Sequence, residues 1–94
     1  MSGFRLTVVT PNSLTTVEDV ELLDVPAVDG RMTVLPGHQP TVCALSRGTL
    51  RLHHAARAND RRMIGPGVMT VSRSGVTLIT RDVTDSLAAD VERV

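Results

Sequence analysis

Short runs of alternating residues, separated by turn residues, make up most of this sequence. Phe4, Leu6 and Val8 recur with a period of two, which is typical of a β-strand with one apolar face. The run stops at Pro11, whose ring nitrogen has no hydrogen for a sheet ladder. Turn signals then recur about every 8–12 residues. This spacing predicts an all-β fold, either a β-sandwich or a barrel.

A longer extended run follows from residue 14 to residue 28, and its apolar residues change phase. Val20 and Leu22 lie on one face of this run, whereas Leu23 and Val25 lie on the other. Such a switch predicts either a β-bulge or a strand that is covered on both of its faces.

Further strands are predicted where turn residues flank apolar runs, at residues 32–35, 41–45, 49–53, 68–71 and 76–80. The last two form a hairpin around Ser72-Arg73-Ser74-Gly75, in which Gly75 supplies a positive φ. The segment from residue 54 to residue 62 is polar, and we predict a loop or a hairpin end there.

The end of the chain has a different pattern. Apolar residues recur at helical spacing between Leu87 and Val94, and Thr84 or Asp85 is a suitable N-cap. Because a chain of 94 residues allows one domain, we predict a single β-sandwich domain over residues 1–83. A short helical tail over residues 84–94 is predicted to follow it.

The composition argues against several classes of partner. Ten arginines balance ten acidic residues, so we expect no binding to nucleic acid. Phe4 is the single aromatic residue, which removes the usual stacking platforms. Cys43 is the single cysteine, so no internal disulfide can form. No signal peptide is apparent and no apolar run reaches about 20 residues, so we expect a soluble, intracellular protein without direct membrane insertion.

The sequence offers little support for catalytic, metal or cofactor sites. His53 and His54 are adjacent, so on a strand they point to opposite faces, and the spacing of His38 and Cys43 matches no specific metal site. No serine lies in a nucleophile-elbow pattern and no Gly-rich phosphate loop is present. We therefore expect no catalytic residue, no metal and no cofactor.

Residues 30–48, GRMTVLPGHQPTVCALSRG, begin the most specific pattern of the chain. Its anchors are glycines, a Pro-Gly-His loop and the apolar residues that follow: Gly30, Leu35-Pro36-Gly37-His38-Gln39-Pro40, Leu45, Gly48 and Leu50-Arg51-Leu52. This pattern resembles that of rotary ATP synthase epsilon subunits. Residues 4–11 are similar to that family's first strand, and residues 67–71 with 76–79 resemble its closing hairpin. The resemblance extends over residues 4–83 in the same order.

The resemblance implies a sandwich of about ten strands. It also implies a non-catalytic rotor subunit that binds the foot of the gamma subunit and rests on the ring of c subunits. Such a subunit couples ion translocation to ATP synthesis in the alpha/beta catalytic hexamer, at the cytoplasmic face of the bacterial inner membrane.

The resemblance also assigns residues to these contacts. Carried over by position, Thr10, His38 and Cys43 are expected to contact gamma, and Gly30 with Arg31 to contact the c ring. The geometry of the His38 loop is expected to depend on Pro36, Gly37 and Pro40.

The sequence departs from the family pattern in two places. Bacterial members often carry an acidic residue where Arg31 stands, so the surface facing the c ring is expected to differ in charge. The family usually continues into a C-terminal helical hairpin that can inhibit ATP hydrolysis, and the present sequence ends at Val94. We expect a subunit that couples without this inhibitory arm, or a truncated chain.

Three other interpretations stay open. The chain could be the epsilon subunit of a variant ion-pumping ATPase. It could be a stand-alone β-sandwich binding module, which predicts a concave apolar pocket. It could be an enzyme that uses His38 and Cys43, which predicts an exposed Cys43 thiol with a lowered pKa. The sequence does not distinguish proton from sodium as the coupled ion.

Overall fold

A computed structural model of the chain describes residues 3–55 and 57–85. The described part consists of β-strands and their connections, and it contains no helix. Nine strands follow one another along the chain: β1 (Phe4–Thr10), β2 (Ser13–Ala27), β3 (Gly30–Val34), β4 (Thr41–Leu45), β5 (Gly48–His54), β6 (Arg57–Ile64), β7 (Gly67–Ser72), β8 (Gly75–Thr80) and β9 (Val83–Asp85).

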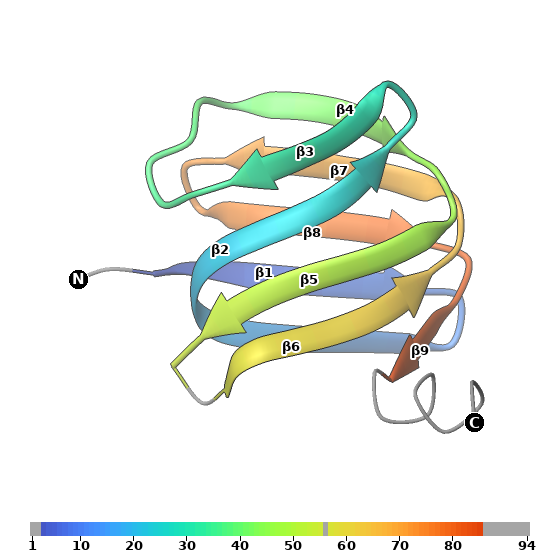
Figure 1. The fold of residues 1–94 in the computed structure, drawn as a ribbon, viewed down its shortest axis with the longest axis horizontal. Coiled ribbons are helices and arrows are strands. Elements are labelled where there is room, and N and C mark those ends of the chain that lie inside the picture. Colours follow the sequence, from blue (N-terminus) through green and yellow to red (C-terminus); the bar gives the residue numbers. More distant parts are fainter. Residues whose placement is uncertain (1–2, 56, 86–94) are drawn as a thin grey trace.

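The strands form two layers that face each other (Figure 1). We name as sheet I the first half of β2 with β1, β8, β7 and β4, and as sheet II the strands β3, the second half of β2, β5, β6 and β9. The pairings are antiparallel except for β1 with β8, which is parallel. The arrangement is the predicted β-sandwich, and β2 belongs to both of its sheets.

Strand β2 passes from one sheet to the other by means of two irregularities. Its pairing with β1 shifts by one residue between Val17 and Val20, where Asp19 has a positive φ of 55°. Its pairing with β5 shifts again between Val20 and Leu22. Each shift moves the following side chains to the other face of the strand. Val17, Val20 and Leu23 are therefore all buried, and the predicted bulge is confirmed.

Apolar side chains from both sheets fill the space between the layers. The most deeply buried large ones, each less than 2% exposed, are Leu6, Leu23, Leu50, Leu52, Ile64, Met69 and Leu78. They come from β1, β2, β5, β6, β7 and β8, so the core joins the two sheets. Partly buried Phe4, Met32, Cys43 and Val83 pack against this cluster. The core therefore holds together both layers that carry the surfaces described below.

Two predictions about secondary structure need correction. The polar segment of residues 54–62, predicted as a loop or a hairpin end, includes the end of the β5–β6 hairpin, but most of it belongs to β6, which pairs with β5 through residues such as Leu52 with Asp60. Its polar pattern misled because Asp60 occupies an inward position, where it is 3% exposed and ion-paired. At the chain end, Thr84 and Asp85 belong to β9 and pair with β6, so the tail does not begin as a helix at Thr84. The rest of the predicted tail lies outside the described residues.

Candidate functional site

A tight turn forms the β3–β4 loop. The amide of His38 donates to the carbonyl oxygen of Leu35 at 3.0 Å, so Pro36 and Gly37 are the two central residues. Gly37 has a φ of 84°. Proline first and a positive-φ glycine second are the requirements of a type II turn, since proline fixes φ near −65° and glycine alone adopts the positive φ without strain. The Pro-Gly-His sequence thus fixes this loop by its own backbone preferences.

The imidazole of His38 is held within the same loop. Its Nδ1 lies 2.8 Å from the carbonyl oxygen of Gln39, and the hydroxyl of Thr41 donates to that oxygen at 2.9 Å. Because a carbonyl oxygen can only accept, the Nδ1 nitrogen carries the hydrogen, and in the neutral imidazole Nε2 is the acceptor. His38 is half-buried. The loop therefore presents a ring nitrogen in a defined orientation.

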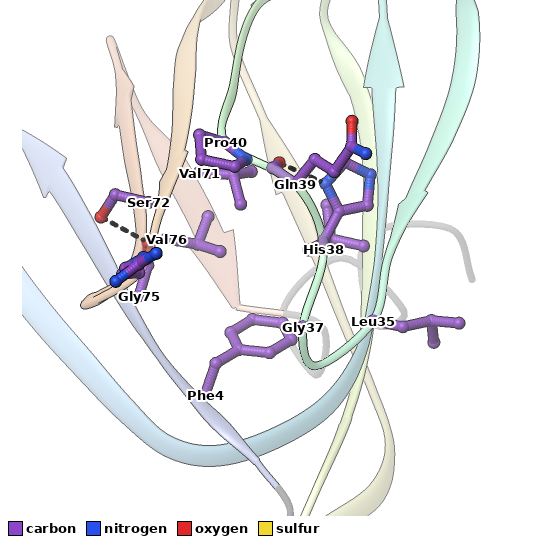
Figure 2. Close-up of a pocket in the computed structure, with 12 residues that line it drawn as sticks. Phe4, Leu35, Gly37, His38, Gln39, Pro40, Val71, Ser72, Gly75 and Val76 are labelled. Atoms are coloured by element: carbon purple, nitrogen blue, oxygen red, sulfur yellow. Dashed lines mark hydrogen bonds between the residues drawn. The ribbon is translucent and has the colours of Figure 1, made fainter.

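A hollow of about 360 Å³ lies beside this loop. Figure 2 shows Phe4, Val71 and Val76 pointing toward the loop from β1, β7 and β8. Leu35, Gly37, His38, Gln39 and Pro40 contribute to its opposite wall. The hollow has an apolar base and a rim of polar groups. Its size suits a single large side chain or a small molecule.

An apolar row crosses the outer face of sheet I. The strand registers place one apolar residue of each strand beside the next: Ala44, Val68, Ile79, Val9 and Leu14. Exposure reaches 44% at Val68, 53% at Ile79 and 68% at Leu14. The neighbouring row consists of Val42, Thr70, Thr77, Thr7 and Thr16. None of these side chains is ionisable, so the two rows form an uncharged face across five strands.

Thr10 lies at the opposite end of β1 from His38. Its hydroxyl is 2.7 Å from that of Ser13, and with Pro66 and Ile79 it lines a second hollow of about 430 Å³. Phe4, which lines the hollow beside His38, begins the same strand. Six residue steps along a strand span about 20 Å. The structure therefore does not bring Thr10 and His38 together, and the uncharged face lies between their two ends of sheet I.

Cys43 points inward from β4 and packs against the core. Burial, and secondarily the negative charge of Asp29, raises the pKa of its thiol above the ordinary value. A raised pKa keeps the thiol protonated and unreactive at neutral pH. The enzyme interpretation required an exposed thiol with a lowered pKa, and Cys43 does not meet that requirement. The outward side chain beside it is that of Val42, which is 71% exposed.

The β2–β3 turn places the other predicted contact residues. Gly30 has a φ of 125°, and Arg31 follows it on β3. The Nη2 atom of Arg31 donates to the carbonyl oxygen of Thr49 at 2.8 Å and lies 3.3 Å from Asp24 Oδ2. Its charge is thus partly neutralised within the chain. The side chain remains 47% exposed, beside a turn whose Val28 is 60% exposed.

The histidines of β5 serve different roles. His53 pairs with Leu22 in the sheet, whereas His54 lies near the inward carboxylate of Asp60, with Nε2 3.1 Å from Oδ2. Across the described residues, no three His, Cys, Asp or Glu side chains converge as metal ligands. In the same part of the chain no helix is long and apolar enough to cross a membrane.

Sequence reasoning missed the apolar row. Val68 and Ile79 had been placed on the correct strands, but their alignment with Val9 depends on the parallel pairing of β1 with β8. That pairing joins segments far apart in the chain, so no local sequence pattern indicates it. An indirect signal was available, because β7 and β8 each carry an apolar residue at a position that alternation turns outward.

Comparison with known proteins gives consistent results. Residues 3–86 match the family described as "ATP synthase, Delta/Epsilon chain, beta-sandwich domain". An ATP synthase epsilon chain of Chlorobium limicola is 33% identical over 81 residues, which cover 86% of this chain and 92% of that protein.

Two solved structures share the fold. A chain in the mitochondrial ATP synthase of Euglena gracilis superposes with a TM-score of 0.81 at 22% identity, covering 99% of this chain and 64% of that one. A chain in the central stalk/c-ring structure of Tetrahymena thermophila gives 0.75 at 11% identity, covering 90% and 69%. This chain thus spans about two thirds of these two relatives. With the family match over residues 3–86, it belongs to the ATP synthase delta/epsilon family, through that family's β-sandwich domain.

Proposed function

We propose that this chain is a non-catalytic rotor subunit in the central stalk of a rotary ATP synthase. It links the gamma subunit to the c ring, so that ion translocation drives ATP synthesis in the alpha/beta hexamer. Family membership supports this function, since the Chlorobium relative is named as an epsilon chain and the Tetrahymena structure is that of a central stalk with its c ring.

The uncharged outer face of sheet I carries the proposal. Scattered exposed apolar residues are ordinary, but here Val68, Ile79 and Leu14 stand in register on three strands of one sheet. Contiguous apolar patches without charged residues mark the centres of protein interfaces. The gamma subunit covers this face, with Thr10 at one end and His38 at the other.

The hollow beside His38 provides an anchor point within that interface. Binding energy in interfaces concentrates where one large side chain fills a desolvated pocket. Phe4, Val71 and Val76 form such an apolar base, and hydrogen bonds within the His38 loop hold the residues of the facing wall. A large apolar side chain of gamma fills this hollow. The side chain of Cys43 faces the core, so it does not contact gamma itself. Its strand, β4, contributes to this interface through its outward residues.

The β2–β3 turn meets the c ring in this proposal. Gly30 and Arg31 lie at the far end of β2 from Leu14, so the two partners contact different parts of the domain. The contacts of Arg31 with Asp24 and Thr49 fix its position before the ring is met. Assembly with the ring places the chain at the cytoplasmic face of a bacterial inner membrane.

Catalysis remains in other subunits. The Cys43 thiol has a raised pKa, and the described residues contain no cluster of metal ligands. The hollow beside His38 favours one alternative, a stand-alone module that binds a small apolar ligand there. A variant ion-pumping ATPase would use the same two partner surfaces. These alternatives differ in what the chain binds in the cell.

Co-purification tests the proposal. A tagged chain, expressed in its own cells, is captured from membranes solubilised with a mild detergent. Gamma, alpha and beta subunits are expected in the eluate, identified by mass spectrometry. Recovery of the chain alone, while the same extract contains intact synthase, contradicts the proposal and leaves the stand-alone module. A control extract from cells with the untagged chain identifies subunits that adhere to the resin.

A further inference from the structure

Three arginines lie on the outer face of sheet II, the side of the molecule opposite the apolar row. Arg31 is on β3, Arg51 on β5 and Arg61 on β6. Arg51 lies between Leu50 and Leu52, which are 1% and 0% exposed, so alternation along the strand turns Arg51 outward. All three arginines are exposed.

Arg51 and Arg61 are direct partners in the β5–β6 pairing. Side chains in such pairs lie about 5 Å apart at Cβ, and like charges in that position repel. Asp24 lies opposite Arg51 on its other side, in the β2–β5 pairing. The sheet therefore places two guanidinium groups together and one carboxylate beside them.

Asp24 does not compensate Arg51. Its Oδ2 atom is 3.3 Å from Arg31 Nη2, and its buried Oδ1 atom has no hydrogen-bond partner. Within residues 3–55 and 57–85, the side chain of Arg51 makes no hydrogen bond and no ion pair. Among the described side chains of this face, Arg31 has Asp24 as a partner and Arg61 also makes an interaction of its own, whereas Arg51 has none.

We propose that this arginine face, centred on Arg51 and Arg61, binds an acidic segment of a partner protein. A carboxylate that accepts hydrogen bonds from Arg51 compensates its charge and offsets its repulsion from the neighbouring Arg61. The planar guanidinium fork suits carboxylates in a way that lysine would not. Arg31 extends the face toward β3. Its Nη1 and Nε atoms make no hydrogen bond within the described residues.

The surrounding chemistry favours carboxylates of a protein over phosphates. The chain as a whole has a formal charge of zero, whereas nucleic-acid binding requires a sustained basic track. The single aromatic residue, Phe4, lines the hollow beside His38, so this face has no base-stacking platform. Asp24 at its centre repels a dense phosphate surface, whereas a few spaced carboxylates can avoid it. Arg51 and Arg61 remain accessible when sheet I is covered. Arg31 also belongs to the proposed c-ring contact, so the inference rests on Arg51 and Arg61 and is independent of the proposed function.

Titration of the whole chain with a short poly-L-glutamate peptide, followed by backbone amide NMR, tests this inference. At about 20 mM salt, where screening is weak, the largest shifts are expected on β5 and β6. The substitution Arg51→Gln is expected to weaken binding about tenfold, the loss typical of a charged hydrogen-bonding group. Arg73→Gln makes the same charge change in the β7–β8 turn and is expected to leave affinity unchanged.

The variant is also informative about folding. Arg51→Gln removes one of two repelling charges, so its thermal midpoint is expected to equal or exceed that of the parent chain. Equal loss of affinity in both variants, or shifts spread evenly over the surface, contradicts a specific site. Tighter binding of a DNA oligonucleotide or of anionic phospholipid vesicles than of the peptide contradicts the choice of partner.

Discussion

His54 and Asp60 face each other across the β5–β6 hairpin, with His54 Nε2 3.1 Å from Asp60 Oδ2. Arg62 Nη2 contacts the same oxygen at 3.2 Å. The side chains of His54 and Asp60 are only 12% and 5% exposed. One carboxylate thus compensates two basic groups at the margin of the core.

Removal of that carboxylate should destabilise the domain. The substitution Asp60→Ala leaves His54 and Arg62 without their shared acceptor, and breaking a buried pair typically costs about 3–5 kcal/mol. Arg62 is 21% exposed and can reach water, so we expect the lower end of that range. Urea denaturation measures the loss. Glu21→Ala, at an exposed position on β2, should change stability by less than about 0.5 kcal/mol. Equal effects of the two substitutions would contradict the role given to Asp60.

The outer face of sheet I offers a direct test of the gamma contact. Ile79→Asp introduces a charge at the centre of the apolar row, where the native side chain is 53% exposed. Folding should be affected by less than about 1 kcal/mol, whereas capture of gamma should fall at least about tenfold. Quantitative pull-down measures how much gamma is captured by the parent chain, by Ile79→Asp and by a control variant. Met63→Asp makes a similar change on sheet II, and it should retain gamma. Retention of gamma by Ile79→Asp would place the interface elsewhere.

The turn before His38 should depend on the backbone of Gly37. Its φ of 84° strains any residue with a Cβ, although no atom lies within 4 Å of the position that a Cβ would occupy. Gly37→Ala should therefore cost about 1 kcal/mol. Gly37→Asn should cost less, because asparagine tolerates positive φ. Thermal or urea unfolding distinguishes the two. A larger loss of stability for Gly37→Asn than for Gly37→Ala would mean that side-chain crowding, and not the positive φ, determines the cost. That result would contradict the open space around the Cβ position.

Alkylation of Cys43 should follow its raised pKa. The thiolate reacts, so the rate should rise with pH around a midpoint above the ordinary pKa value of 9.0. Burial is the larger cause and the charge of Asp29 the smaller. Asp29→Asn should lower the midpoint without restoring the ordinary value, because burial remains. Iodoacetamide labelling followed by mass spectrometry gives the rates, with the urea-unfolded chain as the reference. A midpoint below 9.0 in the folded chain would revive the nucleophile interpretation.

Local patterns in the sequence were sufficient for much of this fold. Alternation and turn residues placed strands at 41–45 and 76–80, and both are present. The phase change in β2 predicted its irregularity, since a strand crossing between sheets must turn its apolar residues back toward the core. These features depend on neighbours in the chain, which a single sequence contains.

Features that depend on distant partners were missed. The sequence of β6 did not indicate a strand, because its inward-facing residue, Asp60, is polar. Asp60 contacts His54 across the β5–β6 hairpin, and the sequence alone does not show this contact. Thr84 or Asp85 was expected to cap a helix, yet both residues pair with β6, and the predicted helix after them lies outside the described residues. The His38 loop followed from its own prolines and glycine. The apolar row did not, because it is assembled from five strands.

Strand β2 joins the two proposed partner surfaces as one covalent element. Leu14, near its beginning, lies in the apolar row, and Ala27, at its end, pairs with Gly30 at the turn assigned to the c ring. Hydrogen bonds to β1 and β5 brace it on both sheets. A force applied at one end of β2 therefore acts along its backbone and shears its hydrogen bonds to β1 and β5. In a rotor, β2 would transmit force along one continuous strand between the surface assigned to gamma and the turn assigned to the c ring.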